Sequence, residues 1–222
     1  RVRVVDTMGE EILTYTEPEY LDHIAEHVEP YSYLKYPYLK ARGWHGFQEG
    51  QGTSIYQAAP LARLNAADGM ATPRANEEFQ KMFDTLGGKP SHKLMVHHWA
   101  RLIELLYAAE RLIELVEDDE IIDPNVRVIP STTPNEGVGI IEAPRGTLTH
   151  HFKTDENGIV TEANLIVGTT NNNAPISMAV KKAAQKFIGK GGEVTDGLLN
   201  MVEMAFRLFD PCFSCATHSL PG

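Results

Sequence analysis

The stretch from Phe209 to Gly222 reads FDPCFSCATHSLPG and holds the only two cysteines in 222 residues, Cys212 and Cys215. They are spaced as Cys-x-x-Cys, with Asp210 and a proline before them and His218 three positions after them. An apolar segment of helical periodicity, LLNMVEMAFRLFD (198–210), runs directly into this motif. We therefore expect the two thiols to lie just past the C-terminal end of a helix, which is a rigid mount.

The residues alone allow three interpretations of this motif. A redox dithiol usually precedes a helix, whose N-terminal dipole lowers the thiol pKa, whereas this pair follows a predicted helix. A zinc site takes four ligands, and Cys212, Cys215 and His218 supply three. Two buried cysteines without a chemical role are the third interpretation, and the flanking Asp-Pro and histidine argue against it.

Composition excludes several classes of partner. Hydrophobic residues make up 42% of the chain and allow a sizeable core, while two cysteines are too few for a disulfide-rich scaffold. The formal net charge of −10 argues against nucleic acid or an anionic membrane surface, because both attract clustered Lys and Arg. No apolar run reaches the roughly 18 residues of a membrane-spanning helix, and we find no secretory signal segment.

The pattern along the chain predicts an α-rich α+β protein. Residues 137–170 contain three β-like runs, of which the last two are joined by the turn signal DENG (155–158). We expect a small antiparallel β-meander there, inserted at about 125–170 in a helical bundle, with residues 1–222 forming one compact unit. The other elements expected are a strand at 1–6, irregular packed structure at 30–52, and helices at 16–28, 72–87, 92–118, 174–189 and 198–210.

The terminal motif is one of several that resemble a known family. DPCFSCATH (210–218) resembles the C-terminal signature D-P-C-x-x-C-x-x-H of nickel–iron hydrogenase large subunits, and EAPRGTLTHHF (142–152) resembles their A-P-R-G-x-L-x-H segment. VEPYSYLKYPYLK (28–40) and YQAAPLARLN (56–65) are similar to stretches of the cytoplasmic branch, which serves heterodisulfide-, viologen- or NAD-linked partners. The likeness covers most of the chain and departs at Ala59, where the family usually has glycine.

The resemblance implies a metal centre of which this chain supplies part. Cys212 matches a terminal nickel ligand and Cys215 a ligand that bridges nickel and iron; the iron carries carbon monoxide and two cyanides. The family's other two cysteines lie in an R-x-C-x-x-C motif that these residues lack. We therefore expect a C-terminal part of a large subunit, without a nickel–iron centre and inactive alone. Its thiols are then neutral, joined in an adventitious disulfide, or bound to a soft ion such as zinc.

The family motifs also imply roles for residues around the metals. Arg145 matches an arginine over the metal pair, which guides the proton or stabilises anionic charge, since a guanidinium is normally protonated throughout. Asp210 matches its acidic partner, so we expect their charged groups within about 10 Å of each other. Cys212 is the alternative acceptor of the proton.

Three further residues match the surroundings of the diatomic ligands. Ala143 and Pro144 match an apolar wall around them, and Thr169 falls where the family places a hydroxyl that donates to a cyanide. Thr170 is adjacent and is the other candidate for that hydroxyl.

His218 matches the residue after which a maturation endopeptidase cuts once nickel is inserted. The new terminal histidine then helps to hold a magnesium or iron ion, and here SLPG still follows it. His150 and His151 are candidate hydrogen-bond donors behind the metal ligands, but we expect them to be structural, and we expect His97 and His98 to be core or surface residues rather than ligands.

The function implied is that of a nickel-dependent hydrogenase, an oxidoreductase that splits dihydrogen reversibly. Its electrons pass to an iron–sulfur small subunit, because two cysteines cannot hold a cluster, and nickel-insertion factors and the endopeptidase are further partners. A cytoplasmic location is expected. The alternatives are a zinc or redox module and a metal-free relative of the complex I quinone-side subunit. As part of a larger protein, the chain should expose apolar surface, above all on the helix at 92–118.

Overall fold

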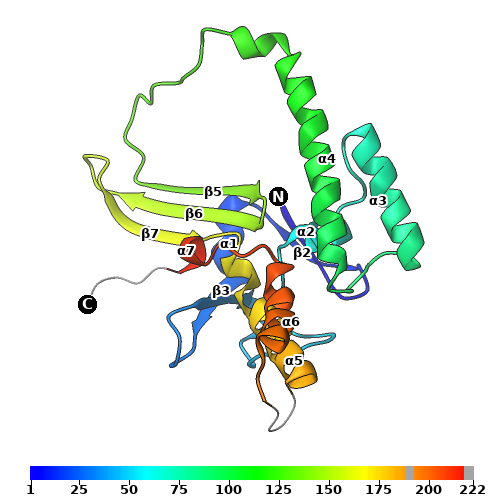
Figure 1. Cartoon of the computed structure of the whole chain (residues 1–222). Coiled ribbons are helices and arrows are strands. Elements are labelled where there is room, and N and C mark those ends of the chain that lie inside the picture. Colours follow the sequence, from blue (N-terminus) through cyan, green and yellow to red (C-terminus); the bar gives the residue numbers. More distant parts are fainter. Residues whose placement is uncertain (189–192, 218–222) are drawn as a thin grey trace.

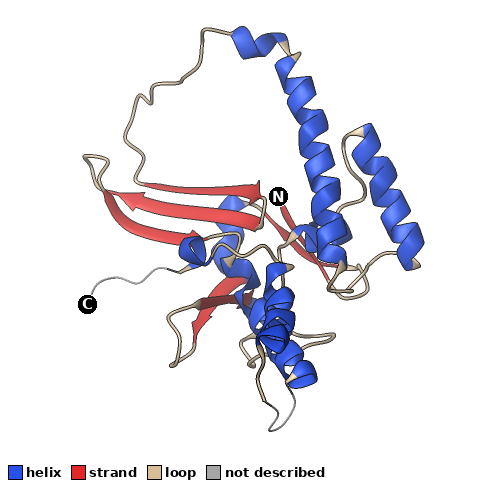
Figure 2. Ribbon diagram, in the orientation of Figure 1, coloured by secondary structure: helices blue, strands red, loops and turns tan. Residues whose placement is uncertain are grey.

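The computed structural model describes residues 1–188 and 193–217, and these form helices and small antiparallel sheets (Figures 1 and 2). The α-rich α+β class is therefore confirmed. The strands are β1 Val2–Val5, β2 Glu11–Tyr15, β3 Ile24–Val28, β4 Lys35–Leu39, β5 Glu136–Ala143, β6 Gly146–Thr154 and β7 Val160–Ile166. The helices are α1 Tyr20–His23, α2 Pro60–Ala66, α3 Pro73–Leu86, α4 Val96–Val116, α5 Asn173–Phe187, α6 Asp196–Arg207 and α7 Phe213–Ala216. Short 3-10 turns lie at Glu17–Glu19, Lys40–Arg42, Asp119–Ile122 and Thr170–Asn172.

The predicted β-meander is present as the three-stranded sheet β5-β6-β7. Strand β6 pairs antiparallel with both neighbours, with Thr149 opposite Ile140 on one side and Ile166 on the other. Its link to β7 is the DENG turn, in which Asp155 Oδ1 accepts hydrogen bonds from two backbone amides. The sheet runs back to the centre of the molecule, where β5 and β6 meet at the Pro144–Arg145 turn (Figure 1).

The helix predicted at 16–28 is wrong beyond His23. Thr16 and Glu19 form a capping box, but the helical segment ends after α1. From Ile24 the chain becomes β3, which pairs with β4 in a segment predicted to be irregular. Ile24 and Leu39 face each other and are both buried, so pairing between distant segments outweighs the local helical pattern.

Helices α3 and α4 follow the predicted pattern and build one core. Thr72 and Pro73 begin α3, and Gly87 ends it in the left-handed conformation, with φ of 90°. The two helices pack against each other and, with α2, bury an apolar cluster: Leu61, Leu64, Ala75, Phe79, Met82, Phe83, Val96, Ala100 and Ile103.

The other side of α4 is exposed, which agrees with the apolar surface that the sequence predicted on this helix. Figure 1 shows the far half of α4 standing clear of the remaining elements. Leu102 and Leu105 are 63% and 64% exposed, and Leu112, Ile113 and Val116 continue the same surface. Within residues 1–188 and 193–217, none of the helices combines the length and the hydropathy that a membrane span requires.

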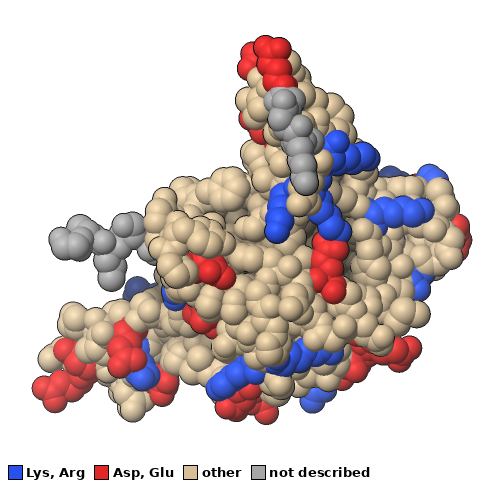
Figure 3. Space-filling view, turned by 90° about the horizontal axis from the view of Figure 1, so that it is seen from below, with Lys and Arg blue, Asp and Glu red and all other residues tan. Residues whose placement is uncertain are grey.

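Helices α5 and α6 lie side by side and lead the chain to its C-terminal motif (Figures 1 and 2). Ile176 of α5 packs with Leu208, Phe209 and Ala59 in a second buried cluster, so the residues just before Asp210 are anchored in the core. On the face seen in Figure 3, acidic and basic side chains are intermingled and much of the surface carries neither.

Candidate functional site

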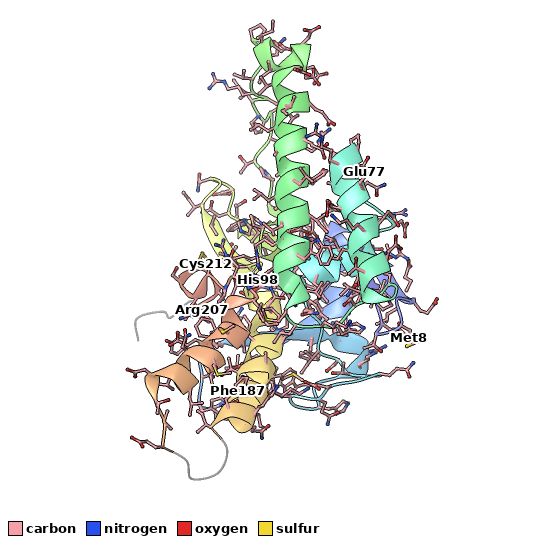
Figure 4. All side chains as sticks on the ribbon, turned by 45° about the vertical axis from the view of Figure 1, so that its right-hand side comes forward. Met8, Glu77, His98, Phe187, Arg207 and Cys212 are labelled. Atoms are coloured by element: carbon pink, nitrogen blue, oxygen red, sulfur yellow. A yellow bond between two sulfur atoms is a disulfide. The ribbon has the colours of Figure 1, made fainter. Side chains whose placement is uncertain are left out.

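The cysteine motif follows α6 and continues into a short helical turn. Cys212 is the residue before α7 and Cys215 lies within it, so Cys212 precedes a helical turn as well as following a helix. The two are joined in a disulfide with Cα atoms 5.3 Å apart, one of the three thiol states expected. Cys215 is exposed and Cys212 half-buried, and Figure 4 labels Cys212 on the segment that follows α6.

Arg145 reaches the start of this motif from the turn between β5 and β6. Its Nε donates to the backbone oxygen of Asp210 at 2.6 Å and lies 3.2 Å from Asp210 Oδ2. The predicted approach of these groups across 65 positions is confirmed. Both side chains are partly exposed, at 39% and 48%, so the contact lies at the surface of the site.

The turn that carries Arg145 is packed too tightly for a side chain at Gly146. That glycine has φ of 143°, and a Cβ there would lie 2.7 Å from the Ala58 oxygen and 2.9 Å from the Gly168 oxygen. These neighbours are backbone atoms and cannot rotate away. The close approach explains why glycine follows Arg145.

Ala143 and Pro144 lie just before Arg145, and their carbonyl groups are held by a residue that sequence reasoning missed. Arg63 of α2 donates from Nη1 to Ala143 O at 2.7 Å and from Nη2 to Pro144 O at 2.9 Å. Glu104 of α4 accepts from Arg63 Nε at 2.7 Å and from its Nη2. Burial lowers the pKa of Arg63, but pairing with Glu104 and, to a smaller extent, Glu142 outweighs this and keeps that pKa above its ordinary value. The sequence feature that could have indicated Arg63 is a single charged residue in the otherwise uncharged segment PLARLNA.

Thr169, rather than Thr170, touches the cysteine motif. The Thr169 side chain is buried, and its Oγ1 accepts a hydrogen bond of 3.1 Å from the backbone amide of Cys212. The Thr170 hydroxyl is also buried and has no hydrogen-bond partner among the described residues. The segment just before the cysteine motif is held by Arg101 of α4, which donates to Leu208 O at 2.8 Å.

Three consecutive asparagines follow these threonines and connect the parts of the site. Sequence reasoning missed these asparagines as well. Asn172 is fully buried; its Nδ2 donates to Arg145 O at 2.8 Å, and its Oδ1 accepts from the Ala58 amide at 2.9 Å. Asn171 donates to Thr147 O at 2.7 Å and accepts from Tyr56. Three amides in a row between a strand and a helix were the signal, since buried amides need several partners.

The histidines expected to be structural lie outside the cysteine motif. His151 bridges Glu136 and Tyr20, at 2.8 Å from each, and His150 is exposed on the same strand. His97 is buried against Phe209. Burial, helped by the nearby charge of Arg101, lowers the pKa of His97 to about 4, so it is neutral at pH 7.

The donor atoms fit part of a nickel or iron site. Two cysteine sulfurs are soft ligands that suit these metals. Among residues 1–188 and 193–217, no group of three or more His, Cys, Asp or Glu side chains could hold a metal ion. The pair therefore supplies two donors, and His218 lies outside the described residues.

Comparison with known proteins matches the chain to one family. Residues 7–218 match the family described as nickel-dependent hydrogenase. The chain is 57% identical to an iron-sulfur subunit of the F420-non-reducing hydrogenase of Archaeoglobus profundus, over 98% of this chain and 45% of the relative. It is 39% identical to the NAD-reducing hydrogenase HoxS subunit beta of Cupriavidus necator, over 99% of this chain and 44% of the relative.

A solved structure agrees with these sequence matches. The crystal structure of an NAD+-reducing [NiFe]-hydrogenase in the H2-reduced state superposes with a TM-score of 0.86 and 40% identity, over 97% of this chain and 46% of that one. The chain thus spans less than half the length of the relatives it matches.

Proposed function

Because this chain belongs to the nickel-dependent hydrogenase family, we propose that it is part of the catalytic subunit of a nickel–iron hydrogenase. The family implies a nickel–iron centre in the complete enzyme. When bound, that centre supplies the metals at which dihydrogen is split heterolytically. The observation that carries the proposal is the convergence of Arg145 on Asp210, two residues before Cys212.

The residues of this chain then have distinct tasks. Cys212 and Cys215, with their disulfide reduced, contribute two sulfur ligands. The Arg145 guanidinium stays protonated and stabilises anionic charge beside them, while its Nε hydrogen bond to Asp210 O fixes its direction. We assign the proton released from dihydrogen to Cys212 Sγ, since a thiolate accepts a proton far more readily than a guanidinium.

The finer features of the centre are also proposals. Thr169 Oγ1 accepts from the Cys212 amide, which leaves its hydroxyl proton free to donate to a cyanide on the iron. Ala143 and Pro144 precede Arg145 and would form the apolar wall around such ligands. His218 would hold a magnesium or iron ion after removal of the tail by a maturation endopeptidase.

The partners proposed are an iron–sulfur small subunit that takes the electrons, and the factors that insert nickel. Both curated relatives described above are named as subunits, which supports an assembly of several chains. The cytoplasmic location and the single compact unit stay predictions. We predict that the 222 residues alone hold no nickel–iron centre. The family's centre takes four cysteine thiolates, and this chain supplies two of them.

The test is hydrogen-dependent dye reduction by the complete enzyme, purified without oxygen. Arg145→Lys should lower turnover by about 100-fold, the scale of one electrostatic contact in a catalytic site, while nickel and iron stay bound. Arg111→Lys, at an exposed ion pair on α4, is the matched control and should leave turnover unchanged. Wild-type turnover in Arg145→Lys would refute the assignment. If the wild type holds zinc in place of nickel and iron, the zinc or redox module is favoured. If it holds no metal, the metal-free relative of the complex I subunit is favoured.

A further inference from the structure

The conformation of Arg145 is fixed by groups on both sides of it along the chain. After it, Gly146 is confined between the Ala58 and Gly168 carbonyl oxygens, and the Arg145 carbonyl itself accepts from Asn172. Before it, the Ala143 and Pro144 carbonyls both point at a single side chain, Arg63.

The Arg63 guanidinium uses every edge of its planar fork. Nε and Nη2 donate to the two oxygens of Glu104, and Nη1 and Nη2 donate to the two carbonyls. One side chain therefore connects α2, α4 and the end of β5. Lysine cannot reproduce this contact, because an ammonium offers three donors at one point and no fork.

Burial makes this arrangement rigid. The side chains of Arg63 and Glu104 are only 18% and 20% exposed. Glu142 is a second ionic partner, with Oε2 3.2 Å from Arg63 Nη1, but it is more than half exposed, so the less exposed Glu104 is the stronger partner. We call Arg63, Glu104 and the two carbonyl groups that Arg63 binds the Arg63 clamp. Because its hydrogen bonds act together, the clamp holds the backbone of the turn at Ala143 and Pro144 in one conformation.

We propose that Arg63, held by Glu104, is a positioning residue that fixes the turn at Ala143 and Pro144 and so aims the Arg145 guanidinium at Asp210, beside Cys212. This inference rests on the proposed hydrogenase function. Arg63 touches neither cysteine within the described contacts, so its effect on the reaction passes through Arg145.

The test uses the complete, nickel-loaded enzyme with Arg63→Lys, Glu104→Gln, Arg145→Lys and the double variant Arg63→Lys/Arg145→Lys. Arg63→Lys should lower kcat about tenfold and change KM for dihydrogen by less than about twofold, because binding of the small substrate does not involve the turn. The double variant should be no slower than Arg145→Lys alone, within about twofold, since both substitutions act through one group. Arg111→Lys is the control.

A second measurement does not depend on activity. Amide hydrogen exchange, followed by mass spectrometry, should speed up at least about fivefold at residues 143–148 and 208–213 in Arg63→Lys. Exchange in α5 should stay unchanged, and so should the nickel and iron content. If Arg63→Lys does not accumulate, the same exchange measurement is made on Glu104→Gln, which keeps the shape of the Glu104 side chain but removes its charge. Exchange at residues 143–148 and 208–213 should again speed up.

The possible results separate the inference from the function it rests on. Full kcat, unchanged exchange at the turn, or an effect that adds fully to Arg145→Lys would each overturn the positioning role. Loss of nickel in step with kcat would reduce Arg63 to a purely structural residue and also overturn it. A wild-type enzyme without nickel-dependent hydrogen turnover would overturn the proposed function, and the inference with it.

Discussion

Arg145 Nε contacts Asp210 twice, at 2.6 Å from its backbone oxygen and at 3.2 Å from Oδ2. The shorter contact needs no carboxylate; it needs the backbone of Asp210 to present its carbonyl. That backbone has φ of 50°, in the left-handed region, and Asp210 is the only non-glycine residue with positive φ within the described part of the chain. The conformation at this position is therefore as important as its charge.

Substitutions at Asp210 should separate conformation from charge. Asp210→Gly and Asp210→Asn suit the left-handed region, whereas Asp210→Ala should be less stable than either by about 1 kcal/mol. The partly exposed ion pair itself should contribute less than about 1 kcal/mol. Urea unfolding of the three variants measures the order. An alanine variant as stable as the glycine variant would contradict the role given to the backbone.

Gly146 offers a sharper test of the turn. Gly146→Ala should lower the free energy of unfolding by roughly 3 kcal/mol, because its Cβ would meet two backbone oxygens below 3 Å. Gly139→Ala, in the neighbouring strand β5, meets nothing within 4 Å and should change stability by less than about 1 kcal/mol. Equal effects of the two substitutions would show that the turn can relax.

His97 should make stability depend on pH. Its pKa is about 4 in the folded state against an ordinary value of 6.5, so the unfolded state binds the proton first as the pH falls. Its contribution is fully present above pH 6.5 and is lost between about pH 6.5 and 4, by up to roughly 3 kcal/mol.

The measurement is unfolding free energy against pH for the wild type, His97→Gln and His98→Gln. His97→Gln should flatten the loss between pH 6.5 and 4. His98 is the exposed neighbour, and its variant should follow the wild type. A His97→Gln curve parallel to the wild type would mean that the buried imidazole is protonated in the folded state.

The apolar side of α4 should make the 222-residue chain self-associate. Leu105 and Leu112 are 64% and 62% exposed on it, and contact between two such surfaces buries them. Sedimentation velocity should detect oligomers of the chain, and Leu105→Glu with Leu112→Glu should weaken association at least about tenfold. Glu117→Gln, at the exposed end of the same helix, is the control. A wild-type chain that stays monomeric at high concentration would contradict this.

The sequence predicted the elements that carry their own signals. The β-meander, α3, α4, α5 and α6 have strong periodicity or caps, and all are present. The helix predicted at 16–28 was wrong because pairing of β3 with β4 depends on a segment further along the chain. The local sequence pattern of one segment does not show which distant strand will pair with it in the fold.

The site divides in the same way. Motif resemblance brought Arg145, Asp210 and Thr169 to attention; the structure joins Arg145 to Asp210, and Thr169 to the backbone amide of Cys212. Arg63 and Asn172 were missed, since their importance lies in carbonyl groups of distant residues that they hold. Every residue has a backbone carbonyl group, so the sequence does not indicate which carbonyl a side chain will bind. Such contacts can be identified only from the folded structure.

The metal content of the complete enzyme tests the central claim, that Cys212 and Cys215 are ligands of its nickel–iron centre. Nickel and iron would be measured in the wild type, Cys212→Ser, Cys215→Ser and Ser214→Ala, each purified with its partner subunits. Ser214 lies between the two cysteines with its Oγ 3.6 Å from Cys212 Sγ, so Ser214→Ala is the control for losing a neighbour of the sulfur that is not itself a ligand. We predict that the wild type and Ser214→Ala hold nickel and iron in equal amounts, and that each cysteine variant loses at least about nine-tenths of its nickel, because a hydroxyl replaces a soft thiolate poorly. Nickel retained at the wild-type level in both cysteine variants would contradict the account.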